Sequence, residues 1–218
     1  MSIILASNSP RRKQLLALGW EYYLTPAEVN ERPLPGERPP DYVLRLAESK
    51  ARSAALEAGQ EDVVIGADTT VADRGELLGK PADPQDALRM LRQLRGHFHQ
   101  VFTAVAVLRM ADGLLLTDLC VTDVPMRQYT DVEIQAYIDS GDALDKAGAY
   151  AIQHAGFHPV QNLSGCYANV VGLPLCHLDR TLRRLSLGAR QEIPEACQSY
   201  FDYHCPVYSQ VLAEMVLQ

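Results

Sequence analysis

The segment Ser7–Arg12 combines the start of a helix with two guanidinium groups, which is a combination that binds phosphate. Ser9 is typical of a helix N-cap and Pro10 of the first helical position, and the free amide groups of a first turn favour an anion. Arg11 and Arg12 add planar donors that hold phosphate oxygens in pairs. The segment therefore indicates either a phosphate site or an ordinary helix start with two solvated arginines.

A carboxylate lies near the end of an apolar segment, Val63–Val71. The segment is rich in β-branched residues and predicts a buried strand, with Asp68 near its carboxyl end. Open α/β sheets bind ligands beyond the carboxyl ends of their strands, so Asp68 is placed to act as a general base or a metal ligand. A buried aspartate can also accept hydrogen bonds from backbone amides, although this strand has no evident cap to make. Gly66 and Ala67 are expected to leave room for a substrate.

Two lysines and a glutamate are further charged candidates. Lys50 lies on the apolar stripe of an expected helix, where it either extends to solvent at the rim or points into a cleft that holds an anion. Lys80 follows a glycine and precedes a proline, which makes it a restrained positive charge. The segment Gly75–Lys80 is not a Walker motif, because its glycines are too close and a proline follows the lysine. Glu31, in the proline-rich loop 25–40, is either a metal ligand or a solvated loop residue.

The spacing of apolar residues predicts the elements that must position these side chains. Strands are expected at 3–6, 63–71, 100–108 and 114–127, and helices at 10–18, 41–58, 83–95, 130–140 and 175–187. Asp41 and Asp83 are expected to cap two of the helices. Thr130 and Glu133 have the spacing of a capping box. The segment 141–153 is expected to be a charged loop that runs into a strand, with small residues that allow a tight backbone passage beside a ligand.

Composition excludes several classes of protein. The chain has 218 residues, of which 47% are hydrophobic and 22% charged, as expected for one globular domain. The net charge of -7 argues against a general nucleic-acid binder, which needs a basic surface. No segment approaches the roughly 18 apolar residues of a membrane span, and no secretion signal is evident, so we expect no membrane partner and a cytoplasmic location. Five cysteines without a C-x-x-C pair indicate neither a disulfide framework nor a zinc ribbon.

Taken together, these motifs resemble the Maf family of nucleoside triphosphate pyrophosphatases over roughly residues 3 to 187. The matching segments are Ser7–Arg12, Glu48–Ala51, Gly66–Thr69, Gly79–Pro81, Asp145–Gln153 and Val171–Leu175. The resemblance implies a mixed α/β fold with a strongly twisted central sheet flanked by helices, two lobes around a cleft, and a relation to inosine triphosphate pyrophosphatases. It also implies a homodimer, a divalent metal cation (Mg²⁺, Mn²⁺ or Co²⁺), and hydrolysis of a nucleoside triphosphate to the monophosphate and diphosphate.

The resemblance also implies roles for individual residues. In the family, the aspartate of the Gly-Ala-Asp-Thr motif is the proton acceptor, which corresponds to Asp68. The residues that mark the branch acting on dTTP and UTP correspond to Arg11, Thr69 and Gln153, and the 7-methyl-GTP branch differs at the last two. A glutamine amide can pair with the edge of thymine or uracil as both donor and acceptor. The expected substrates are therefore dTTP and UTP, or modified pyrimidine nucleotides.

The remaining implied residues bind the metal ion and the phosphates. Asp68 and Glu31 are expected to hold the metal ion, while Asp68 deprotonates a water that attacks the α-phosphorus. Phosphoryl chemistry depends mostly on placement and electrostatics, so a set of cations should surround the leaving diphosphate. The expected phosphate-binding residues are Ser9, Arg11, Arg12, Lys50, Lys80 and Lys146.

The chain extends beyond the family's usual length. We expect a nucleotide pyrophosphatase domain at 1–187 and a C-terminal extension at 188–218 that packs on the domain or in a dimer. A terminal amphipathic helix is indicated by Val207, Val211, Leu212, Met215 and Val216. A metal site formed by Cys197, His204 and Cys205 is an alternative role for the extension, but their spacing fits no standard pattern.

A second function of another class is also compatible with the resemblance. The family has been linked to cell-division arrest, so the fold can serve as a nucleotide-sensing or partner-binding module in which hydrolysis is incidental. Asp68 argues for an enzyme, because a sensor needs no base beside the phosphates. Turnover of several nucleotides would distinguish the two hypotheses.

Overall fold

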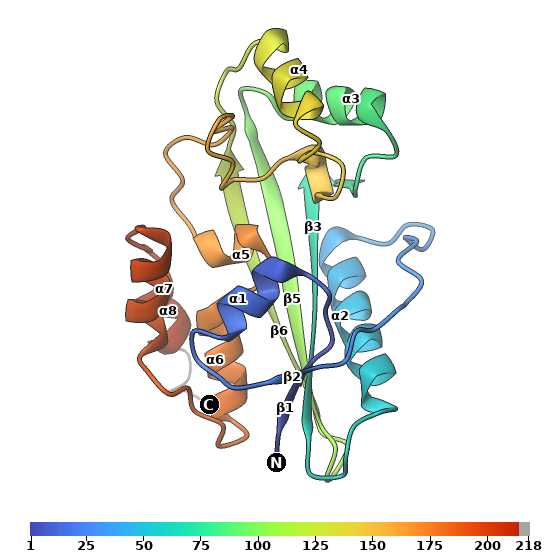
Figure 1. The fold of residues 1–218 in the computed structure, drawn as a ribbon, viewed down its shortest axis with the longest axis vertical. Helices are drawn as coiled ribbons and strands as arrows, with labels where there is room; N and C mark the ends of the chain where they lie inside the picture. Colours follow the sequence, from blue (N-terminus) through green and yellow to red (C-terminus); the bar gives the residue numbers. More distant parts are fainter. Residues whose placement is uncertain (214–218) are drawn as a thin grey trace.

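The computed structural model describes residues 1–213 and shows a mixed α/β fold built on one six-stranded sheet (Figure 1). The strands are β1 (Ile3–Leu5), β2 (Tyr23–Leu24), β3 (Val63–Asp73), β4 (Glu76–Leu78), β5 (Phe98–Arg109) and β6 (Leu115–Pro125). Their order is β2-β1-β3-β5-β6, and β4 also pairs with β3. β1 is parallel to β2 and β3, whereas β5 is antiparallel to β3 and β6. The predicted mixed α/β fold is confirmed.

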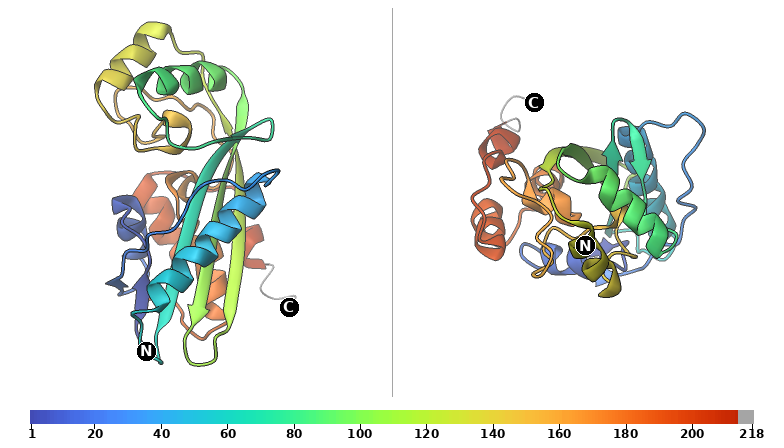
Figure 2. Two further views of the ribbon diagram at one scale, coloured as in Figure 1. Left: turned by 90° about the vertical axis from the view of Figure 1, so that its right-hand side faces the viewer. Right: turned by 90° about the horizontal axis from the view of Figure 1, so that it is seen from above.

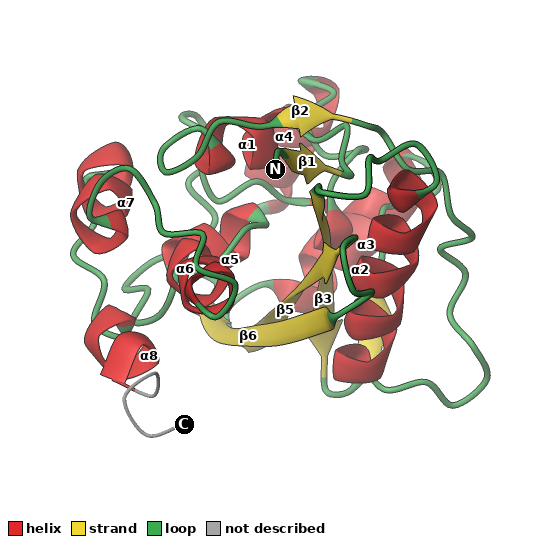
Figure 3. Ribbon diagram, turned by 90° about the horizontal axis from the view of Figure 1, so that it is seen from below, coloured by secondary structure: helices red, strands yellow, loops and turns green. Residues whose placement is uncertain are grey.

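The long strands carry helices on both faces of the half of the sheet that is drawn lower in Figure 1. The helices of this half are α1 (Pro10–Leu16), α2 (Pro39–Ala55), α5 (Tyr167–Val171) and α6 (Leu175–Arg183). Helix α2 covers one face, and α1, α5 and α6 lie on the other (Figure 3). Successive strand side chains alternate between faces, so Val63 and Ile65 share a core with α1 and α6 while Val64 packs with α2.

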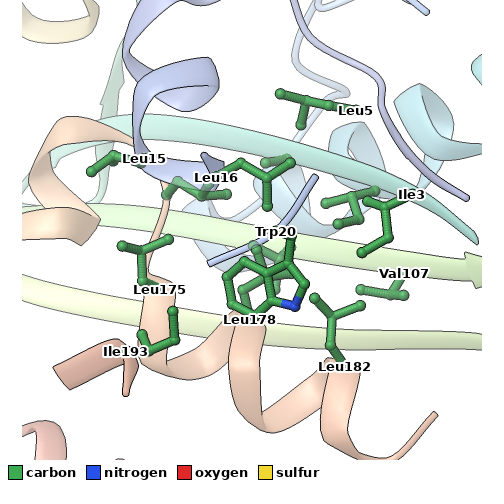
Figure 4. Packing of buried hydrophobic residues seen from close by; sticks show 14 of the residues in the cluster. Ile3, Leu5, Leu15, Leu16, Trp20, Val107, Leu175, Leu178, Leu182 and Ile193 are labelled. Carbon is green, nitrogen blue, oxygen red and sulfur yellow. The ribbon is translucent and has the colours of Figure 1, made fainter. Parts of the chain in front are cut away.

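The core between the sheet, α1 and α6 fixes the segment that carries the two arginines. Trp20 lies among Leu16, Leu178 and Leu182 in this core (Figure 4), and its indole Nε1 donates a 3.3 Å hydrogen bond to the carbonyl of Leu187. Each fully buried leucine contributes about 1.5–3 kcal/mol. Helix α1 is therefore held against the sheet by apolar packing, independently of any ligand.

A second lobe surrounds the upper ends of β3, β5 and β6 (Figure 2). It contains α3 (Pro84–Leu94), α4 (Asp131–Asp139) and a short 3-10 helix, η1 (Ala147–Ala149). Their apolar side chains form a separate core around Leu91, Leu94, Ile134 and Tyr137. Asp83 caps α3, and Thr130 with Glu133 forms the capping box of α4, which confirms both predictions.

The predicted start of the second helix is wrong. Helix α2 begins at Pro39 with Arg38 as its N-cap residue, and not after Asp41. Proline is tolerated at the first helical positions because their amide groups have no partner within the helix. The carboxylate of Asp41 instead accepts hydrogen bonds from the guanidinium of Arg38, at 2.7 and 3.2 Å.

The strand expected at the end of segment 141–153 is also absent from the described residues. The chain forms η1 there, and both Gly148 (φ 67°) and Ala149 (φ 59°) have a left-handed backbone conformation. Two consecutive left-handed residues are incompatible with an extended strand. Gly148 also approaches β3 so closely that a Cβ atom would lie 2.9 Å from a methyl group of Val71. The prediction that small residues allow a tight backbone passage here is correct, but the passage forms a turn and does not lead into a strand.

The C-terminal extension packs beside α6. It contains α7 (Ile193–Phe201) and α8 (Tyr208–Ala213), and Ile193 is fully buried in the core of the lower half. Two residues of the predicted terminal amphipathic helix, Met215 and Val216, lie outside the described residues. Within residues 1–213, no group of three or more His, Cys, Asp or Glu side chains is arranged to hold a metal ion, and no helix is long and apolar enough to span a membrane.

Candidate active site

A cavity of about 480 Å³ opens where two strands stop short along one edge of β3. β1 pairs with β3 only over Val63–Ile65, and β4 pairs with it only over Val71–Asp73. Among the described residues, no strand pairs with residues 66–70 on this edge of β3. On the opposite edge, β5 pairs with them. Asp68 and Thr69 lie in this gap and line the cavity.

Every side chain that was named as a site residue from the sequence lines this one cavity. These residues are Ser9, Arg11, Arg12, Glu31, Lys50, Asp68, Thr69, Lys80, Lys146 and Gln153. They come from segments that are far apart in the sequence, and the fold brings them together at the junction of the two lobes. The predicted convergence on a single cleft is therefore found in the structure.

Lys50 bridges the two carboxylates that were expected to hold a metal ion. Its Nζ lies 2.6 Å from Oδ1 of Asp68 and 2.6 Å from Oε1 of Glu31. Lys50 and Asp68 are buried, whereas the Glu31 side chain is half exposed at the mouth of the cavity. Of the two alternatives for Lys50, the structure shows the one in which it points into the cleft, although its partners here are carboxylates of the protein.

The two carboxyl groups differ in proton affinity. Burial raises the pKa of Asp68, and the nearby cations Lys50 and Arg12 oppose this shift without cancelling it. Partial burial also acts to raise the pKa of Glu31, but hydrogen bonding and attraction to Lys50 outweigh burial and lower that pKa. Asp68 is therefore the stronger base of the pair.

Arg12 is held in place by the fold as well as facing the cavity. Its Nε donates to the carbonyl of Gly172 at 2.8 Å, and its Nη2 donates to Oγ1 of Thr69 at 2.9 Å. Gly172 adopts φ +116°, and a Cβ atom there would lie 3.3 Å from Oγ1 of Thr69, so this position needs glycine. Ser9 is the N-cap of α1, as predicted, and accepts a long 3.4 Å hydrogen bond from the amide of Arg12.

The other lysines differ in how they are paired. Lys146 is buried, and its Nζ contacts the backbone carbonyl and Oδ1 of Asp142, both at 2.7 Å, and Oδ1 of Asp145 at 2.5 Å. Lys146 must therefore exchange a carboxylate partner before it can contact a ligand. Lys80 and Gln153 are exposed at the rim of the cavity, where a ligand reaches them without displacing the core.

One expectation about small residues near Asp68 is corrected. Gly66 was expected to leave room for a substrate, but a Cβ atom there would lie 2.1 Å from the carbonyl oxygen of Ala47. Ala67 is fully buried in the core of the lower half. Gly66 therefore allows helix α2 to pack closely on β3, and this close packing brings Lys50 within reach of Asp68.

Two structural contributors were not found from the sequence. The hydroxyl of Tyr42 donates to the backbone carbonyl of Glu31 at 2.8 Å, which ties the 25–38 loop to α2 beside the cavity. Burial, with the nearby Asp68 and Glu31, raises the pKa of Tyr42 to about 12, so this hydroxyl remains a donor at neutral pH. Tyr42 lies about two helical turns before Lys50, which was an available signal. Thr103 lies beside Thr69 on the neighbouring strand β5. No signal in the sequence points to its role, because threonine is common in strands.

These features define an α/β protein with an interlobe cleft in which a buried basic carboxylate faces several cations. A profile of the Maf-like protein family matches residues 2–185. The chain belongs to this family, which confirms the resemblance drawn from the motifs.

Individual relatives are similar over most of their length. The chain is 48% identical over 195 residues to a dTTP/UTP pyrophosphatase from Anaeromyxobacter dehalogenans (strain 2CP-1), covering 88% of this chain and 98% of the relative. It is 47% identical over 183 residues to a dTTP/UTP pyrophosphatase from Geobacter sp. (strain M21), covering 84% and 94%. Among solved structures, a HAM1 protein from Coxiella burnetii matches with a TM-score of 0.46 and 14% identity over 75% of this chain and 82% of that chain.

Proposed function

We propose that this protein hydrolyses dTTP and UTP, or modified pyrimidine nucleoside triphosphates, to the monophosphate and diphosphate. The observation that carries the proposal is the buried Asp68, a carboxylate of raised pKa that faces a cavity lined by arginines and lysines. Membership of the Maf-like family and the names of relatives that are 47% and 48% identical support the same reaction.

The acidic pair fits a divalent cation. Asp68 and Glu31 each use one oxygen for Lys50, and among the described residues no partner is found for Oδ2 of Asp68 or Oε2 of Glu31. Mg²⁺ is typically held by one or two carboxylates together with substrate phosphates and water. When bound by Asp68 and Glu31, Mg²⁺, Mn²⁺ or Co²⁺ would neutralise charge on the phosphate oxygens.

The protein's own side chains supply the remaining functions. Asp68 accepts the proton of the water that attacks the α-phosphorus, and Lys50 holds the carboxylate in position. Arg11, Arg12 and Lys80 stabilise the charge that develops on the leaving diphosphate, with Ser9 and Lys146 beside them in the cavity. Thr69 and Gln153 line the same cavity and contact the base.

The test is turnover of dTTP, UTP, CTP and 7-methyl-GTP with Mg²⁺ or Mn²⁺, with identification of the phosphate product. We expect diphosphate as the product, with dTTP and UTP as the best substrates. Tight binding of one nucleotide without turnover of any would instead support the sensor hypothesis. The family resemblance also supports a homodimer and a cytoplasmic location, which light scattering and cell fractionation would test.

A further inference from the structure

A chain of hydrogen bonds runs from the cavity wall into the interior of the sheet. Nη2 of Arg12 contacts Oγ1 of Thr69 at 2.9 Å, and Oγ1 of Thr69 contacts Oγ1 of Thr103 at 2.9 Å. Oγ1 of Thr103 in turn lies 3.0 Å from the backbone carbonyl oxygen of Asn169. The chain joins α1, β3, β5 and α5, and Thr103 at its centre is fully buried and does not line the cavity.

The chemistry of the two ends fixes the direction of every hydrogen in this chain. A carbonyl oxygen only accepts, so Thr103 must donate its single hydroxyl hydrogen to Asn169. Thr103 can then only accept in its contact with Thr69, which makes Thr69 the donor between the two hydroxyl groups. A guanidinium only donates, so Thr69 also accepts from Arg12.

This ordering leaves Thr69 with one unused lone pair and no free hydrogen. Thr69 is partly exposed and lines the cavity, so it can offer a ligand only a hydrogen-bond acceptor. Uracil and thymine carry a donor at N3, whereas N3 of cytosine is itself an acceptor. Two acceptors that face each other make no hydrogen bond, and an unpaired polar group in a partly closed site is costly.

We propose that Thr103 is a positioning residue that fixes Thr69 as an acceptor and thereby favours uracil and thymine over cytosine. This inference rests on the proposed function, because it assigns the ligand to the same cavity. Without the Thr103 hydroxyl, the hydrogen of Thr69 is released and can rotate toward the cavity, where it pairs with N3 of cytosine.

The experiment compares the full-length wild type with Thr103→Val, which replaces the hydroxyl with a methyl group of similar size. The ratio of kcat/KM for CTP to kcat/KM for UTP should rise at least about tenfold. Thr103→Ser restores the hydroxyl and should return this ratio to within about twofold of the wild type. An unchanged ratio in Thr103→Val would overturn the proposal.

Thr122→Val is the matched control. Thr122 is also buried in a strand, and its hydroxyl accepts a 2.9 Å hydrogen bond from the side-chain Nδ2 of Asn169, but it makes no hydrogen bond to Thr103, to Thr69 or to the backbone carbonyl of Asn169. A purely structural effect of losing a buried hydroxyl should appear equally in this variant, so its ratio should stay at the wild-type value. An equal rise in both variants would contradict a specific role for Thr103.

Two further measurements keep the proposal independent of folding and of turnover. If Thr103→Val does not fold, as judged by its near-ultraviolet circular dichroism, Thr103→Ala carries the same expected change in ratio. If the wild type hydrolyses neither UTP nor dTTP, the proposed function fails, and the ratio of dissociation constants for CTP and UTP then tests Thr103 in the same variants.

Discussion

Lys50 has two carboxylate partners in the cleft, and this arrangement shapes the chemistry of the site. The buried lysine lies between two carboxylates and compensates their charge, and all three side chains line the cavity. Removing one partner of a buried ion pair is much more costly than removing an exposed one, because the remaining charge stays desolvated. The sequence indicated that Lys50 points into a cleft or to its rim, but it could not show that both carboxylates share it. That contact depends on where the 25–38 loop folds back.

At the scale of one residue, Lys50→Met should lower the free energy of unfolding by about 3 kcal/mol, because it leaves Asp68 buried without its cation. Chemical denaturation followed by circular dichroism measures this change. Arg38→Met on the same helix is the control, since Arg38 pairs with Asp41 on the surface and its loss should have no measurable effect. Equal stability of wild type and Lys50→Met would show that the buried pair contributes nothing.

At the scale of elements, the close approach of α2 to β3 sets the site. Gly66 lets the backbone of α2 lie against the strand, and α2 carries both Lys50 and Tyr42. The same helix therefore contributes to the core, to the charge at Asp68 and to the anchoring of Glu31.

Gly66→Ala should separate α2 from β3, because the added methyl group meets the carbonyl of Ala47 and the amide of Ala51. Overpacking of this kind costs about 1–3 kcal/mol, and we expect reduced turnover together with a lower melting temperature. Gly188→Ala is the control, because no atom lies within 4 Å of the added methyl group there. A Gly66→Ala protein with the same melting temperature as the wild type would show that α2 does not pack as closely on β3 as the structure indicates.

The elements that sequence could predict are those specified by local chemistry. Caps at Asp83 and Thr130 mark the starts of α3 and α4, and the continuous run of apolar, β-branched residues marks β3 as a buried strand. β2, with only two exposed residues, has no such pattern, and its place beside β1 depends on pairing distant in sequence. The candidate site residues were named mainly from motifs and all line the cavity, whereas the role proposed for Thr103 works through another side chain and has no motif. The turn at 147–149 required knowledge of Val71, against which Gly148 packs.

At the scale of the whole molecule, two lobes with separate cores meet at the cleft. His99 lies at the upper end of β5, within the upper lobe, and its Nε2 is 2.8 Å from the hydroxyl of Tyr150 in the same lobe. Burial, with a smaller contribution from His97, lowers the pKa of His99 to about 3, while Asp73 acts in the opposite direction. The folded protein therefore contains neutral His99 at all pH values near neutrality.

The stability of the molecule should consequently fall as the pH is lowered. In the unfolded chain the imidazole binds a proton below about pH 6.5, whereas the folded protein excludes that proton until about pH 3. Because the unfolded state binds more protons than the folded state, the free energy of unfolding decreases as the pH falls. The decrease is at most about 1.4 kcal/mol per pH unit. Between pH 8 and pH 5, this contribution changes by about 2 kcal/mol.

Denaturation curves of wild type and His99→Gln between pH 5 and 8 measure this contribution. The glutamine of the variant cannot bind a proton. Its free energy of unfolding should therefore fall by about 2 kcal/mol less than that of the wild type between pH 8 and pH 5. Identical pH dependence of the two proteins would contradict the assignment to His99.

The proposed reaction requires Asp68 to accept a proton during hydrolysis of a nucleoside triphosphate. Asp68→Asn keeps the shape of the side chain and removes its basicity, so diphosphate release from dTTP should be abolished while dTTP binding, measured by calorimetry, persists. Diphosphate release by Asp68→Asn at a rate near that of the wild type would contradict the claim.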